Sequence, residues 1–203
     1  MANGAKGVYA CIGASNHSLE EREEHDFYST DPKMAYAIME LEPQLNNIWE
    51  PCCGTGHLAK PFEEKGKLSY VSDLVDRGYR PEKARWKYGE ECDMLKIDTT
   101  KKYNGDIVTN PPYAICQEVI TNALEKLEGG RYCCMFLKLT FLESKSRQVL
   151  FDKYPPKRVW VSRSRVQCPK DGNIEKYHRS AIAYAWYVWQ KGYQGDTILK
   201  WFN

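Results

Sequence analysis

The chain has 203 residues, of which 42% are hydrophobic and 28% charged, and its formal net charge is +2. This length and composition suit a globular protein with one α/β domain better than one with two small domains. No apolar run is long enough to span a bilayer, and the N-terminus lacks the basic-then-apolar order of a signal peptide. We therefore expect a cytoplasmic protein without a membrane partner.

The charge is unevenly distributed along the chain. Residues 131–203 carry 14 Lys and Arg against 5 Asp and Glu, a net of +9, whereas residues 1–130 carry 15 against 22, a net of −7. A basic C-terminal third suggests that a polyanion docks on one face. An unevenly charged solvated surface explains the same counts, so charge alone supports nucleic acid only weakly.

The eight cysteines show no metal-binding spacing. None forms a C-x-x-C pair, and two pairs, Cys52-Cys53 and Cys133-Cys134, are adjacent in the chain. Adjacent residues of a strand point to opposite faces, so such pairs rarely share one metal ion. The four histidines are scattered. We expect reduced thiols used as small apolar residues, and no metal.

Hydrophobic periodicity predicts an alternation of strands and helices. Residues 1–24 lack this periodicity and are expected to form a flexible arm, with a single domain over 25–203. The predicted helices lie at 31–42, 57–65, 80–86, 115–127 and 144–154. The predicted strands lie at 47–50, 68–74, 92–97, 106–109, 131–141, 158–166 and 181–190. This order predicts a mostly parallel sheet with helices on both faces, and the last two strands, which no helix separates, predict an antiparallel final strand.

A glycine-containing turn follows the strand expected at 47–50. Residues 50–56 read EPCCGTG and lead into the helix expected at 57–65. Gly54 and Gly56 let the backbone approach a ligand closely, and the helix start offers free N–H groups. Dinucleotide-binding turns have this placement, whereas the lack of a following G-K-[ST] excludes a P-loop. A tight strand–helix turn without a ligand explains the motif equally well.

Two acidic residues, Asp73 and Asp93, follow this turn at spacings that suit contacts with a nucleoside ligand. Asp73 lies 17 residues after Gly56, close to where an acid reaches the two ribose hydroxyls of a nucleoside ligand. Asp93 is placed to accept a hydrogen bond from an adenine amino group, although Glu90 and Glu91 compete for that role. The alternative for Asp73 is a residue that merely starts a turn.

The segment GDIVTNPPY (105–113) ends an apolar strand with a polar amide and two prolines. Pro111 and Pro112 fix the chain direction and remove N–H donors, so that the Asn110 amide oxygen and the Pro111 carbonyl can both accept from one NH2 group. Tyr113 offers a flat face for a planar ring. An NH2 group attached to a planar ring is a poor nucleophile. Two acceptors stabilise the positive charge that develops on its nitrogen when it attacks. The alternative is a stiff proline turn.

The segments HDFYSTDP, EPCCGTG and TNPPY, with Asp73 between the last two, resemble the S-adenosylmethionine-dependent amino-methyltransferases, most closely the DNA adenine-N6 type. Through FLKLTFLES and AIAYAWYVWQKG the sequence is also similar to small methyltransferase-like proteins of phages and mobile elements, over residues 16–203. The resemblance implies S-adenosylmethionine as cofactor and a Rossmann-like α/β fold. Its seven-stranded sheet would be mostly parallel, with a reversed final strand and helices on both faces.

The resemblance also implies roles for individual residues. The catalytic motif would comprise Asn110, Pro111, Pro112 and Tyr113. The cofactor would contact Asp26, Phe27, Tyr28, Thr30, Glu50, Pro51, Cys52, Gly54, Gly56, Asp73, Leu74, Asp93, Met94 and Asn110. No large insertion could serve as a target-recognition domain, so a partner is a candidate source of specificity.

Adenine N6 in DNA is the first substrate that these features suggest. A duplex base would have to flip out to reach Asn110, while Lys138, Arg163 and Arg165 are the candidates for phosphate contacts. The two arginines are two residues apart and are expected on one strand face. The alternatives are RNA adenine, a protein glutamine amide, a cofactor-binding module without catalysis, and, last, a Rossmann oxidoreductase.

Overall fold

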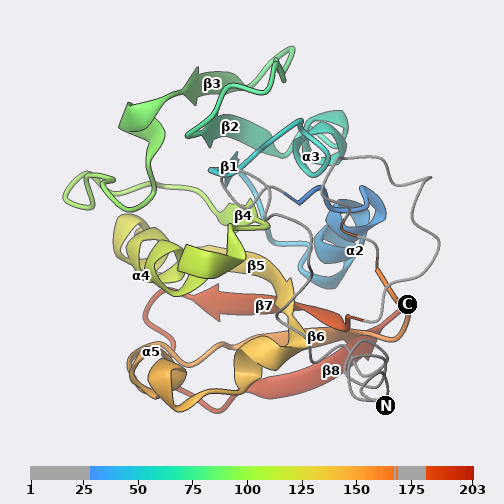
Figure 1. Cartoon of the computed structure of the whole chain (residues 1–203), viewed down its shortest axis with the longest axis vertical. Helices are drawn as coiled ribbons and strands as arrows, with labels where there is room; N and C mark the ends of the chain where they lie inside the picture. The colour runs from blue at the N-terminus through green and yellow to red at the C-terminus, as the bar shows by residue number, and fades with distance from the viewer. Residues whose placement is uncertain (1–27, 167, 169–181) are drawn as a thin grey trace, which may run out of the picture.

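Residues 28–166, 168 and 182–203 are described by a computed structural model of the chain (Figure 1). The predicted arm at 1–24 and two of the predicted cofactor residues, Asp26 and Phe27, lie outside these residues.

The strands of the described residues join one sheet in the order β3-β2-β1-β4-β5-β7-β6-β8. They comprise β1 (Ile48–Glu50), β2 (Leu68–Asp73), β3 (Arg85–Tyr88), β4 (Ile107–Thr109), β5 (Tyr132–Lys138), β6 (Arg158–Ser162), β7 (Tyr184–Gln190) and β8 (Ile198–Phe202). Strand β7 runs antiparallel to both its neighbours, and the other pairings are parallel. Strand β2 lies on one side of β1 and β4 on the other, so the order in which successive strands are added to the sheet reverses at β1.

Helices cover both faces of the sheet (Figure 1). The α-helices are α2 (Lys33–Leu41), α3 (Ala59–Glu64), α4 (Cys116–Lys126) and α5 (Gln148–Lys153). Short 3₁₀ turns are η2 (Glu90–Cys92), η3 (Tyr113–Ile115), η4 (Leu139–Leu142) and η5 (Lys145–Arg147). Helices α4 and α5 pack on one face and α2 on the other, where Phe62 of α3 also packs, so that the apolar side chains of the sheet are buried on both sides.

The central strands show why both faces need cover. Adjacent residues of β5, Cys133 and Cys134, are fully buried in different clusters, one under α4 and one under α2. In β7, Trp186 and Tyr187 are divided in the same way. Alternate side chains of a strand face opposite sides, and here both sides are apolar.

The predicted fold class is confirmed, but the strands differ from the prediction in number and in length. The sheet has eight strands where seven were predicted, because β8 follows the reversed strand β7 and pairs in parallel with β6. Strand β8 was not predicted, although its sequence ILKWF is rich in apolar residues; it is an edge strand in which four of the five residues are exposed. Strand β6 is also shorter than predicted and ends at Ser162 rather than residue 166.

Two predicted elements between β2 and β4 are wrong. The helix predicted at 80–86 is a loop that enters strand β3, and the strand predicted at 92–97 is replaced by the turn η2 and further turns. Strand β3 is an edge strand whose first three residues are exposed, although its sequence RWKY alternates polar and aromatic residues as a strand does. Gly89, with φ +105°, then turns the chain out of the sheet before residue 92.

Two further elements are shorter than predicted. The strand predicted to 141 ends at Lys138 and bends into η4, and the helix predicted from 144 begins only at Gln148, after η5. Ser144, with φ +126°, separates the two turns. No helix among the described residues has the length and apolar character needed to cross a membrane.

Candidate active site

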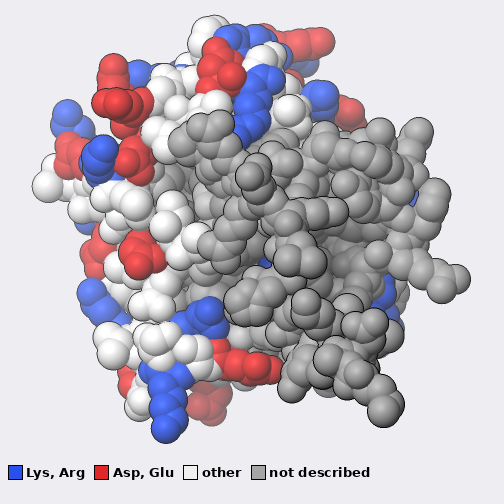
Figure 2. Space-filling view, viewed as in Figure 1, with Lys and Arg blue, Asp and Glu red and all other residues white. Residues whose placement is uncertain are grey.

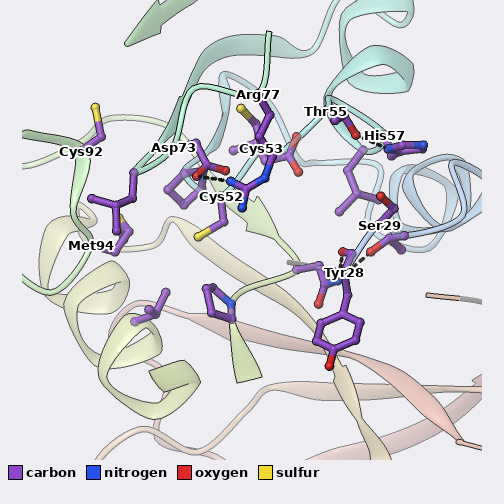
Figure 3. A pocket seen from close by; sticks show the side chains of 18 of the residues that line it. Tyr28, Ser29, Cys52, Cys53, Thr55, His57, Asp73, Arg77, Cys92 and Met94 are labelled. Carbon is purple, nitrogen blue, oxygen red and sulfur yellow. Dashed lines mark hydrogen bonds and ion pairs between the residues drawn. The ribbon is translucent and has the colours of Figure 1, made fainter. Parts of the chain in front are cut away.

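A cavity lies at the carboxyl end of the parallel strands, where the order of the sheet reverses. Its volume is about 340 Å³, and its walls include the ends of β1 and β2 and the residue that follows β4 (Figure 3). Open α/β sheets bind ligands at this reversal, and small-molecule sites commonly occupy about 300–1,000 Å³. The cavity is therefore large enough for a nucleoside-sized ligand.

The structure brings most of the predicted cofactor residues to this cavity. Those that line it are Tyr28, Thr30, Glu50, Pro51, Cys52, Asp73, Leu74, Asp93, Met94 and Asn110. Pro112 of the predicted catalytic motif lines it too. Gly54 and Gly56 do not line it, and neither do Pro111 and Tyr113.

Two carboxyl groups lie side by side in the cavity wall. Glu50 ends β1 with only 2% of its surface exposed, and its Oε2 has no hydrogen-bond partner among the described residues. Burial raises the pKa of Glu50 well above its usual 4.5, and the negative charge of Asp73 adds to the shift. Burial thus disfavours the charged form of Glu50, whereas a cationic group in the cavity would favour the carboxylate.

Asp73 is held in place by backbone donors. Its Oδ2 accepts from the N–H of Gly54 at 2.8 Å, and its Oδ1 accepts from that of Val75 at 3.0 Å. Arg77 Nη1 lies 3.6 Å from Oδ1, and Arg77 itself lines the cavity (Figure 3). Burial raises the pKa of Asp73 above 3.8, although these donors and the guanidinium oppose the shift.

Asn110 directly follows β4, and its amide group is anchored on one side only. Its Nδ2 donates to Thr30 Oγ1 at 2.8 Å and to the carbonyl oxygen of Tyr28 at 3.2 Å. Its Oδ1 is buried without a hydrogen-bond partner among the described residues. An amide held in this way presents an unused acceptor next to the cavity.

Tyr113, which the sequence predicts to stack on the ring of the target, does not line this cavity. Its side chain borders a second hollow of about 60 Å³, together with Lys138, Thr140, Phe141 and Arg147. Lys138 Nζ lies 4.9 Å from the centre of the Tyr113 ring. Segment 110–113 thus contributes Asn110 and Pro112 to the main cavity and Tyr113 to the second hollow.

Sequence reasoning missed several polar residues of the cavity. Ser29, Thr55, His57 and Arg77 all line it. Ser29 Oγ is buried without a hydrogen-bond partner among the described residues, and Thr55 Oγ1 lies 2.8 Å from His57 Nδ1. Burial and the nearby charge of Lys60 lower the pKa of His57 below 6.5. Their only sequence signal was their place within or just after the motifs STDP, GTGH and SDLVDR.

The positions of the candidate phosphate-binding residues agree only in part with the prediction. Lys138 ends β5 beside Tyr113. Arg163 and Arg165 do not share a strand face, because β6 ends at Ser162. Arg163 Nη1 donates to the carbonyl oxygen of Asn203 at 3.4 Å. On the face seen in Figure 2, the described acidic and basic side chains are interleaved rather than separated by sign.

The cysteines of the described residues are free thiols. Cys52 lines the cavity, where burial raises the pKa of its thiol well above 9. Within the described ranges, no three His, Cys, Asp or Glu side chains gather as metal ligands would.

No protein-family model matches the sequence, and no curated protein is detectably similar to it. Solved structures share its fold. A candidate class I S-adenosylmethionine-dependent methyltransferase from Listeria monocytogenes aligns with a TM-score of 0.60 and 12% identity, covering 97% of this chain and 72% of the other. A candidate RNA methyltransferase from Pyrococcus horikoshii aligns with a TM-score of 0.55 and 12% identity, covering 79% and 82%.

The M protein of the type I restriction enzyme EcoKI aligns with a TM-score of 0.57 and 13% identity. The alignment covers 83% of this chain but only 44% of the M protein. The chain therefore has the fold of class I S-adenosylmethionine-dependent methyltransferases, and at these identities the likeness is one of fold.

Proposed function

We propose that the protein is an S-adenosylmethionine-dependent methyltransferase that methylates an exocyclic amino nitrogen, with adenine N6 in DNA as the first candidate acceptor. The observation that carries the proposal is the unused acceptor of Asn110, which is buried beside a nucleoside-sized cavity at the reversal point of the sheet. The fold supports the cofactor, and this acceptor supports an amino group as the target.

The polar groups that line the cavity match the hydrogen-bonding groups of the cofactor. Glu50, whose Oε2 has no partner among the described residues, suits the ammonium group of the methionine part, and Asp73 suits the two ribose hydroxyls. Asp93 also lines the cavity and suits an adenine amino group. The apolar side chains of Leu74, Met94, Ile115 and Val119 would border the purine ring.

When bound, S-adenosylmethionine supplies a methyl group on an electron-poor sulfonium. The chain itself orients the acceptor. Asn110 Oδ1 accepts a hydrogen bond from the target NH2 group, which turns the nitrogen lone pair towards the methyl group and stabilises the positive charge on that nitrogen. The proton can leave to solvent after transfer, so no strong base is required within 110–113.

Methyl transfer from tritiated S-adenosylmethionine to separate pools of unmethylated DNA, RNA and protein tests the proposal. Asn110→Ala removes the acceptor and should abolish transfer while the cofactor still binds. Asn104→Ala is the matched control, because Asn104 accepts from Arg131 Nε at 3.0 Å on the surface. Label in RNA or protein alone would keep the chemistry and change the substrate. Cofactor binding without transfer to any pool would favour a binding module.

A further inference from the structure

The amide of Asn110 can adopt only one orientation in this structure. The carbonyl oxygen of Tyr28 cannot donate a hydrogen bond, and it lies 3.2 Å from the Asn110 atom assigned as Nδ2. If the amide were flipped, two oxygens would face each other at this distance. The NH2 group must therefore face residues 28 and 30, and Oδ1 must face away from them.

Both anchors come from one short segment that lies far from Asn110 in the chain. Thr30 and Asn110 are separated by 80 residues, and their side chains meet at 2.8 Å. Ser29 and Thr30 are 3% and 2% exposed, so this segment is packed in place. It forms one wall of the cavity, beside Asn110 (Figure 3). The same segment thus borders the cofactor site and contacts the predicted catalytic amide.

The hydroxyls of Ser29 and Thr30 differ in a way that divides their roles. Thr30 Oγ1 accepts from Asn110 Nδ2 at 2.8 Å. Ser29 Oγ is buried without a partner among the described residues and lines the cavity. A buried hydroxyl with no partner is the one that a ligand can satisfy, whereas the Thr30 hydroxyl is already engaged.

We propose that Thr30, with the carbonyl of Tyr28, is the positioning element for Asn110, and that Ser29 rather than Thr30 contacts the cofactor. This inference rests on the proposed function, and it reassigns Thr30, which the sequence placed among the cofactor contacts. Thr30 keeps the Asn110 amide from rotating, so that Oδ1 meets the target amino group without a search among orientations. The segment that borders the cofactor therefore also aligns the acceptor.

The test compares Thr30→Val and Thr30→Ala, which remove the hydroxyl, with Thr30→Ser, which keeps it. Thr109→Val is the matched control, because Thr109 is also buried and adjoins Asn110, but its hydroxyl makes no hydrogen bond to the amide. At saturating cofactor, the loss of the hydroxyl should lower the single-turnover rate roughly 10–100-fold and change the cofactor Kd less than about twofold. Thr30→Ser should recover most of the rate.

Ser29→Ala should show the reverse ratio, with a cofactor Kd raised about tenfold and a smaller loss of rate. The proposal is overturned if Thr30→Val raises the Kd as much as it lowers the rate, or if the rate does not change. The first result would make Thr30 a cofactor contact, and the second would make it a packing residue.

A second readout does not depend on activity. The side-chain NH2 signals of Asn110, assigned by their loss in Asn110→Ala, should exchange with solvent slowly in the wild type and in Thr109→Val. In Thr30→Val and Thr30→Ala they should exchange at least about tenfold faster, because one of two anchors is lost. Unchanged exchange refutes the anchor. Faster exchange in a protein that transfers no methyl group supports the anchor and refutes the proposed function instead.

Discussion

The backbone N–H of Gly54 donates to Asp73 Oδ2 at 2.8 Å and so joins the turn after β1 to the end of β2. A second bond, from the Cys53 N–H to the Ser72 carbonyl oxygen at 3.1 Å, reinforces the same junction. Gly54 adopts φ +53° there and does not line the cavity. Its role in the site is therefore to aim the Asp73 carboxylate rather than to touch a ligand.

Gly56 should tolerate a methyl group less well than other glycines with positive φ. Its φ is +83°, and a Cβ atom there would lie 2.5 Å from the Tyr79 ring. We expect Gly56→Ala to lower the free energy of unfolding by about 2–4 kcal/mol, from backbone strain and overpacking together. Gly66→Ala is the matched control, with φ +66° and open space around it, and should cost only about 1 kcal/mol. Equal costs in urea unfolding would show that the Tyr79 contact is unimportant.

The sequence predicted the parts of the structure that local patterns determine. Asp73 and Asn110 each end or follow a buried strand, and parallel strands bring such positions to one edge. The resemblance placed Glu50 and Asp73 in one site, and the structure brings both to the same cavity. These residues were predictable because each directly follows a strong strand signal.

Contacts between distant segments were not predictable in the same way. Arg77 reaches Asp73 through the conformation of a loop, and Tyr113 turns towards Lys138 rather than into the main cavity. The anchor of Asn110 on Thr30 depends on how residues 28–30 pack against β4. No periodicity or spacing encodes such contacts, because they follow from tertiary packing.

Glu42 should be important for stability. Only 1% of its surface is exposed, and it accepts hydrogen bonds from Arg158, from Trp160 Nε1 at 2.8 Å and from Gln44 Nε2 at 2.6 Å. We expect Glu42→Ala to lower the free energy of unfolding by about 3–5 kcal/mol, because it leaves the half-buried Arg158 guanidinium without its partner. Glu91→Ala, which removes an exposed ion pair with Lys87, should change the free energy of unfolding far less in the same urea titration.

The contribution of Glu42 should also depend on pH. Burial tends to raise the pKa of Glu42, but the hydrogen bonds from Arg158, Trp160 and Gln44 outweigh it, so the pKa is lowered below 4.5. A lowered pKa in the folded protein stabilises it above pH 4.5, and this stabilisation is lost as the pH falls through the lowered value. The difference in unfolding free energy between wild type and Glu42→Ala should therefore shrink in acid. A pH-independent difference would contradict the assignment.

The contribution of Glu50 to the free energy of unfolding should fall as the pH rises. Its pKa in the folded protein is raised, so the stability linked to its protonation is present below pH 4.5 and is lost as the pH rises through the raised pKa. Asp73, whose pKa is also raised, adds a change of the same sign from about pH 3.8 upwards. Glu50→Gln should therefore flatten most of the decline in unfolding free energy as the pH rises above 4.5.

The same residue should link cofactor binding to proton release. A bound ammonium group favours the Glu50 carboxylate, so binding at a pH below the raised pKa should release a proton. Calorimetry in buffers of different ionisation enthalpy measures that release. Glu50→Gln should abolish it and weaken binding roughly 10–100-fold. Proton release that persists in Glu50→Gln would assign it to another group, with Asp73 as the first candidate.

If the acceptor is a nucleic acid, Lys138 and Arg165 should carry more of the salt dependence of binding than Arg163. Arg165 is exposed beyond β6, whereas the Arg163 guanidinium is bonded to the carbonyl oxygen of Asn203. Each lost phosphate contact should reduce the slope of log K against log salt by about 0.9 for duplex DNA. Lys65→Ala is the matched control, since Lys65 also lies over a tyrosine ring, that of Tyr36, but follows helix α3 and does not belong to the sheet. If Lys138→Ala and Arg165→Ala leave the slope as Lys65→Ala does, the nucleic acid contacts a different face.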